Sequence, residues 1–228
     1  MASTTLPPQR APERRRRWAF WVGITMITVG VVILGYVAWQ FFGTNWVSHR
    51  HQQQVTRSIE KGWGSGSTTV ETHFGKASAL IEIPRFGPDY RVPVFSGTSD
   101  RVLAVGFGHF AHSAAPGAVG NYALAAHRVT HGQPLRHMPD LRKGDEVRVL
   151  TRSTTYVYRL TTGGDDLVVP FTAGWVVSPL PRNPSAGGVQ PAQKPGQRLL
   201  TLTTCSELFH TDNRMVAFGV LASEHPTE

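Results

Sequence analysis

The chain has 228 residues, of which 40% are hydrophobic and 17% charged, and it contains 23 glycines and 16 prolines. This composition indicates one globular domain with appendages, rich in turns rather than in helices. The net charge is +8, but five arginines and one glutamate lie within residues 1–17, so half of the excess belongs to the N-terminus. The rest is only mildly basic and has no basic stripe interleaved with aromatic residues, which argues against a nucleic-acid partner.

Residues 18–42 carry no charged side chain. As a helix they would extend over about 38 Å, enough to span the ~30 Å hydrocarbon core of a membrane with some tilt. A cleaved signal peptide fits less well, because the apolar stretch is long and no small-residue cleavage site follows it. The arginines before the helix predict a single-pass protein of the cell membrane, with residues 1–17 as a cytoplasmic tail and all that follows the helix outside.

Residues 43–76 are polar, with glycine and serine concentrated at 62–67. They predict an extracytoplasmic stalk, in part helical from Trp46 to Lys61. From residue 77 to residue 224, short strand signals alternate with glycine and proline, which favours a closed β-barrel or a sandwich. The predicted strands are 79–83, 92–95, 121–126, 146–151, 155–160, 167–170, 175–178, 199–204 and 215–221, with helical turns near 99–103 and 134–138.

Cys205 is the only cysteine, so it cannot form an internal disulfide. It ends a strand in which alternation places it on one face with Thr201 and Thr203. Taken alone, such a residue is either a small buried hydrophobe or a reactive thiol. Arg214 begins the next predicted strand, and a hairpin would return its guanidinium to the thiol, where a cation lowers the thiol pKa.

A cysteine nucleophile needs a proton-transfer partner and a group that holds the oxyanion. His127 is the best candidate for the partner, because it ends the apolar segment 122–126 much as Cys205 ends its own strand. The competing interpretation is an ordinary histidine at a junction between strand and loop.

The histidine spacing also allows a zinc site. His109 with His112, and His127 with His131, have the spacing of ligand pairs that Cys205 could complete. These pairs lie in predicted loops or at strand ends, and no HExxH motif is present. We therefore expect no metal and no cofactor.

The segment Thr201-Leu202-Thr203-Thr204-Cys205, with Arg214 after it, resembles the TLxTC strand of the sortases, the membrane-anchored cysteine transpeptidases of Gram-positive bacteria. The histidine segment 120–128 and the segments 79–95 and 143–145 are similar as well, and the resemblance covers about residues 77–222. It is strongest to the class E sortases of actinobacteria.

This resemblance implies an eight-stranded β-barrel in which Cys205 attacks the Thr–Gly carbonyl of a sorting signal near the C-terminus of a secreted protein. It implies that His127 protonates the leaving amine, that Arg214 holds substrate and oxyanion, and that Thr204 assists at the oxyanion. The thioester would pass to an amine, in wall anchoring that of a lipid-linked peptidoglycan precursor. Residues 182–197 fall where sortases place a wall of the substrate groove.

Two positions depart from the family pattern. Class E sortases resemble one another in a Gly-His-Tyr segment, whose tyrosine is linked to a preference for alanine in the signal, whereas this chain has Phe110 after His109. Both LAxTG and LPxTG signals therefore stay open. Many relatives also have proline two residues after the cysteine, where this chain has Glu207, and we expect wall anchoring rather than pilin polymerisation.

Two alternatives belong to other classes. One is a catalytically silent, membrane-tethered β-barrel that binds peptide or cell wall, which a replacement of Cys205, His127 or Arg214 would favour; all three are present. The other is an unrelated wall hydrolase of the papain type. Such enzymes place cysteine before histidine and at the start of a helix, whereas here the histidine comes first and the cysteine ends a strand.

Overall fold

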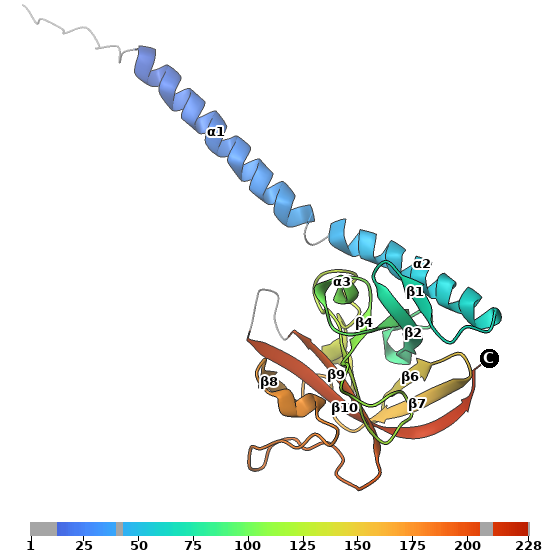
Figure 1. Cartoon of the computed structure of the whole chain (residues 1–228). Helices are drawn as coiled ribbons and strands as arrows, with labels where there is room; N and C mark the ends of the chain where they lie inside the picture. Colours follow the sequence, from blue (N-terminus) through green and yellow to red (C-terminus); the bar gives the residue numbers. More distant parts are fainter. Residues whose placement is uncertain (1–12, 40–42, 206–211, 228) are drawn as a thin grey trace, which may run out of the picture. The chain divides into compact units, whose positions relative to one another are not determined.

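The computed structural model describes residues 13–39, 43–205 and 212–227 (Figure 1). The chain divides into two compact units, Met1–Phe42 and Gly43–Glu228.

The first unit contains the helix α1 (Glu13–Ala38). Its stretch Arg17–Ala38, 22 residues with a mean hydropathy of 2.1, is the one described helix that is long and apolar enough to cross a membrane. Its large apolar side chains are exposed on every side, and a helix that is apolar all round fits a lipid environment. The last three residues of the predicted span, 40–42, lie outside the described residues.

The second unit begins with the helix α2 (Thr44–Gly64), where the sequence predicted a partly helical stalk. Val55 and Ile59, one helical turn apart, are only 4% and 0% exposed. They pack in a cluster with Leu80 and Phe95 of the barrel. The structure therefore differs from the expected stalk: the segment is longer as a helix and forms part of the folded unit.

The described residues of the second unit form ten strands in one sheet. The strands are β1 (Val70–Thr72), β2 (Gly75–Glu82), β3 (Arg91–Ser96), β4 (Phe107–His109), β5 (Gly120–Ala125), β6 (Glu146–Leu150), β7 (Thr154–Leu160), β8 (Val168–Pro170), β9 (Arg198–Cys205) and β10 (Asn213–Pro226). They are ordered β1-β2-β3-β4-β5-β9-β10-β7-β6, with β8 on β10, and β6 pairs back with β2. Eight strands, β2 to β7 with β9 and β10, thus close a barrel, as predicted.

Alternation along the strands separates the barrel interior from its outer surface. In β9, Leu200 and Leu202 lie in the main core cluster together with Tyr122 and Leu124 of β5. The intervening Thr201 faces the other way, where its hydroxyl donates to the carbonyl of Val176 at 3.1 Å. This period of two is what the sequence of β9 dictates.

The short helices account for most differences from the predicted elements. They are η2 (Pro84–Phe86), α3 (Asp100–Leu103), η3 (Met138–Asp140) and η4 (Gly174–Val177). The predicted strand at 175–178 is wrong, because this segment is η4. Its Val176 carbonyl accepts hydrogen bonds from the side chains of Asn121 and Thr201, so side chains take the place of a strand partner. The three-residue strands β1 and β4 were not predicted.

Candidate active site

Two parallel strands end together at one side of the barrel. β5 runs parallel to β9, with Ala125 opposite Thr203. Beyond that pair, the N–H of Ala126 donates to the carbonyl of Thr203 at 3.2 Å. His127 and Cys205 each follow two residues after the matched pair. The backbone register therefore brings the predicted histidine and cysteine positions to the same end of the sheet.

Arg214 lies on the other side of β9. β10 runs antiparallel to β9, and Arg214 is the Cα partner of Cys205. The guanidinium carbon of Arg214 lies 3.8 Å from the centroid of the Phe171 ring. Phe171 follows β8, and 63% of its side chain is exposed. The ring thus holds the guanidinium beside the residue that follows β8 by a cation–π interaction.

The hydroxyl of Thr204 connects the cysteine strand to the histidine segment. It donates to the carbonyl of Ala126 at 2.7 Å, and Thr204 is only 3% exposed. This bond fixes the backbone that immediately precedes His127 against the residue that immediately precedes Cys205. Thr204, which the resemblance to sortases implies as an assistant at the oxyanion, donates its hydroxyl proton to the backbone in this structure.

Burial, and to a smaller extent the neighbouring His131, lower the pKa of His127 to about 4, and the carboxylate of Asp100 acts in the opposite direction. The imidazole of His127 is therefore uncharged at neutral pH. The two imidazole rings are stacked, with centroids 5.1 Å apart. Burial also lowers the pKa of His131, again opposed by Asp100. A neutral imidazole at this position can accept a proton.

The loop after His127 is held by α2. His131, Gly132 and Gln133 all have positive φ, at 55°, 78° and 48°, a conformation that is unfavourable for the two residues with a Cβ. The N–H of Gly132 donates to Oδ1 of Asn45 in α2 at 2.9 Å. A Cβ at Gly132 would lie 2.6 Å from Nε2 of Gln52. Helix and loop are therefore in close contact, and the positive φ of Gly132 favours glycine at this position.

A cavity of about 410 Å³ lies beside Arg214. It is lined by Thr98, Asp100, Leu103, Phe110, Ala125, Val169, Pro170, Phe171, Ala173, Gly174, Val176, Val177 and Arg214. Phe110, the predicted substrate-binding residue, therefore shares a cavity with the predicted catalytic arginine. The apolar walls come from β8 and η4, so the cavity suits a peptide with small apolar side chains.

Two other predictions concern this region. Residues 182–197, expected as a groove wall, contribute no side chain to the described lining; instead they bond among themselves, with the N–H of Asn183 donating to Oε1 of Gln190 at 3.0 Å. For zinc, no three histidine, cysteine or acidic side chains gather among those that the structure describes. A ring nitrogen of His109 instead lies 3.0 Å from the carbonyl oxygen of Ala114.

Sequence reasoning missed two contributors to the site. Phe171 carried a weak signal, an aromatic residue directly after a short strand. Asn45 carried none, because it lies more than eighty residues before the loop that it holds, and only the packing of α2 brings them together.

The fold and the three strand ends define a class: a β-barrel protein with a cysteine, a histidine and an arginine position gathered at one end of the barrel. The family model of the sortase domain matches residues 81–222. The chain therefore belongs to the sortase family. Homologues in this family are transpeptidases.

The similar proteins include class E sortases. Sortase SrtE1 of Streptomyces coelicolor is 34% identical over 213 residues, which cover 90% of this chain and 57% of that protein. Sortase SrtE2 of the same organism is 27% identical, covering 88% of this chain and 80% of that protein. The solved sortase E of Streptomyces avermitilis is 35% identical with a TM-score of 0.57, covering 68% and 93% of the two chains. This chain spans less than two thirds of the length of SrtE1.

Proposed function

We propose that this protein is a membrane-anchored cysteine transpeptidase that joins secreted proteins to the cell wall. The observation that carries the proposal is the convergence of His127, Cys205 and Arg214 at the ends of β5 and β9 and the start of β10. These are the residue types that acyl transfer through a thioester requires: a nucleophile, a proton carrier and a cation for the oxyanion.

In the proposed reaction, the sulfur of Cys205 bonds to the threonine carbonyl carbon of the sorting signal. The low pKa of His127 supports its first role, since a neutral imidazole accepts the thiol proton. The same proton then passes to the glycine nitrogen as the C–N bond breaks, which leaves a thioester and a free amine. Arg214 stabilises the negative oxygen that forms in between.

The thioester is resolved by the reverse sequence with a different amine. The acceptor amine loses a proton to His127 as its nitrogen bonds to the carbonyl carbon, and Cys205 leaves and regains a proton. We propose the amine of a lipid-linked peptidoglycan precursor as acceptor. Water in its place would give hydrolysis.

The proposed signal is LAxTG-like or LPxTG-like. The cavity beside Arg214 supports a peptide ligand, because it combines one cation with apolar walls and the ring of Phe110. A solved sortase E1 of Streptomyces coelicolor, 31% identical with a TM-score of 0.56 over 69% of this chain and 94% of that one, is described with a tripeptide in its active site. Phe110 lacks the hydroxyl that the class E tyrosine carries. Both alanine and proline therefore stay open at the second position of the proposed signal.

The membrane anchor is proposed to be α1, with residues 1–17 in the cytoplasm and the barrel outside. The length and hydropathy of Arg17–Ala38 support the span. The arginine cluster before it supports the orientation by the positive-inside rule. Substrates that arrive by secretion and precursors that are bound to the outer leaflet would then meet the site on the same side.

The test uses the full chain in detergent with fluorogenic peptides carrying LAxTG and LPxTG, with and without an amine acceptor, and reads products by mass spectrometry. We expect cleavage between threonine and glycine, an amine-dependent product, and loss of both in Cys205→Ala and His127→Ala with the fold intact. Joining of peptide to amine by Cys205→Ala would refute the mechanism. No turnover together with a thiol inert to an alkylating probe would favour a silent binding barrel. Comparing the peptide preference of Phe110→Tyr with that of the parent then shows whether a hydroxyl on this ring shifts the preference between alanine and proline at the second signal position.

A further inference from the structure

The helix α2 has a fixed orientation on the barrel. Its buried residues Ser48, Gln52, Val55 and Ile59 follow one another at intervals of three and four and face the folded unit. Because this side is packed, the opposite side is directed away from the barrel in every copy of the protein.

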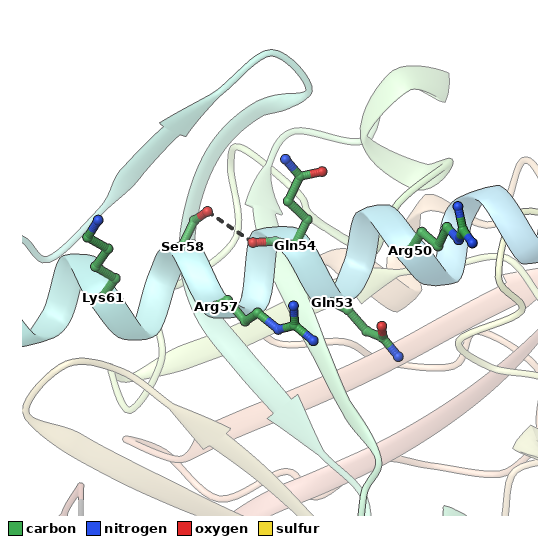
Figure 2. A pocket seen from close by; sticks show the side chains of 6 residues that line it. All are labelled: Arg50, Gln53, Gln54, Arg57, Ser58 and Lys61. Carbon is green, nitrogen blue, oxygen red and sulfur yellow. Dashed lines mark hydrogen bonds between the residues drawn. The ribbon is translucent and has the colours of Figure 1, made fainter.

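That opposite side carries a basic stripe, which we define as Arg50, Arg57 and Lys61. At 100° per residue the three lie within an arc of about 40°, opposite the buried side. All three are exposed. Figure 2 shows them along α2 with Gln53, Gln54 and Ser58. The six residues line an open hollow of about 430 Å³.

Within α2, the described residues leave no carboxylate to neutralise the stripe. The one acidic residue of α2, Glu60, accepts a hydrogen bond at 2.7 Å from Arg91 of β3 and is thereby engaged with another cation. Among the described residues, no ion pair joins Arg57 or Lys61 to a carboxylate. A row of exposed cations with polar, uncharged neighbours is suited to an anionic surface rather than to one small anion.

The N-terminal end of the stripe carries a residue typical of a membrane interface. Trp46 is 57% exposed, and its ring lies beneath the guanidinium of Arg50, with 3.7 Å between the guanidinium carbon and the ring centroid. Trp46 falls on the same side of α2 as the stripe. An exposed indole beside a cation has its lowest free energy at the level of lipid headgroups, where the ring is partly desolvated and the charge meets phosphate.

The chain length allows this helix to reach the surface of a membrane that holds α1. Thr44 follows Ala38, the end of the membrane-spanning stretch, by six residues, which reach at most about 20 Å when extended. We propose that the basic stripe, with Trp46, binds the anionic phospholipid headgroups of the membrane that holds α1. The proposal rests on the proposed membrane anchor and goes beyond it, because it assigns a lipid partner to α2.

The experiment uses the full chain in lipid nanodiscs. Cys205→Ala removes the native thiol, and Gln54→Cys, beside the stripe, takes a bimane fluorophore. Quenching by a lipid with a nitroxide on its headgroup reports contact, in discs of phosphatidylcholine alone or mixed with phosphatidylglycerol. The test variant adds Arg50→Gln, Arg57→Gln and Lys61→Gln. The control variant instead adds Arg142→Gln, Lys143→Gln and Arg152→Gln, which replace three exposed cations in loops of the barrel.

We expect strong quenching only in discs with phosphatidylglycerol, and its loss near 1 M salt, where the screening length is about 3 Å. The test variant should lower the ratio of bound to free helix about 100-fold, at roughly fivefold per cation, while the control keeps it. Equal quenching in neutral and anionic discs, or in parent and test variant, refutes the proposal alone. A chain that does not enter the discs refutes the anchor and the proposal together. Protection of the label by a soluble polyphosphate, with no response to anionic lipid, would assign the stripe to another anionic partner. It would refute the proposal that the stripe binds lipid headgroups.

Discussion

Replacing Asn45 by alanine tests whether α2 positions the candidate histidine. Asn45 accepts a hydrogen bond from the N–H of the buried Gly132 at 2.9 Å, and this bond joins the helix to the loop after His127. In Asn45→Ala that N–H loses its acceptor, in a loop already strained by the positive φ of His131 and Gln133. We expect the loop to leave its present conformation for part of the time and to carry His131 away from His127.

The magnitude follows from the buried N–H. An unpaired buried donor costs about 1–3 kcal/mol; the backbone strain at His131 and Gln133 is present in the parent as well, so it favours opening of the loop but does not add to this difference. Because about 1.4 kcal/mol corresponds to a factor of ten, a fall of about tenfold in kcat is expected. KM should stay near the parent value, since neither Asn45 nor Gly132 lines the cavity beside Arg214.

The assay is peptide cleavage by the full chain in detergent, with kcat and KM measured separately across pH. Asn45→Asp keeps an acceptor oxygen and should restore most of kcat. Thr56→Val on the same helix removes a buried hydroxyl that has no partner, and so serves as the matched control. If Asn45→Ala and Thr56→Val have the same kcat and the same pH profile, α2 does not position the histidine and the reasoning is refuted.

Three further substitutions test the site. In His131→Asn a neighbouring positive charge disappears and the pKa of His127 rises from about 4, so the acid limb of the kcat/KM profile should move to higher pH; an unmoved limb contradicts the coupling. Phe171→Leu removes the ring beneath the Arg214 guanidinium and should lower kcat/KM about two- to fivefold, as an exposed cation–π contact of about 0.5–1 kcal/mol implies, whereas Phe171→Tyr should not. Thr204→Val should lower the free energy of unfolding by about 1–2 kcal/mol in a denaturant titration, because a buried carbonyl loses its donor, and Thr204→Ser should preserve it.

The barrel was predictable because its strands carry their signal locally. β9 alternates leucine and threonine, and the alternation sets which side chains enter the core wherever one face is buried. η4 was not predictable in this way, since Trp175-Val176-Val177 has strong strand propensity. Its conformation depends on Asn121 and Thr201, which are distant in sequence and bind the Val176 carbonyl.

The candidate site likewise contains residues that a local pattern predicts and residues that only the packing brings together. The positions of Cys205 and His127 follow from the ends of two apolar strands, and a pattern can find such ends. The support beneath them depends on packing: Thr204 reaches Ala126, and Asn45 reaches Gly132 across the interface of α2 with the loop. Polar side chains in a predicted stalk have no period that would indicate such contacts.

The helix α2 gives the protein two separable properties. Its inner side holds the loop of the candidate histidine through Asn45, and its outer side presents Arg50, Arg57 and Lys61. Both sides belong to one helix, which begins six residues after the apolar stretch Arg17–Ala38, so a helix bound to lipid would also be held against the loop. Changes on the inner side should therefore alter turnover in detergent and in membranes alike. Changes in the basic stripe should alter it only where anionic lipid is present, because in detergent the stripe has no partner to lose.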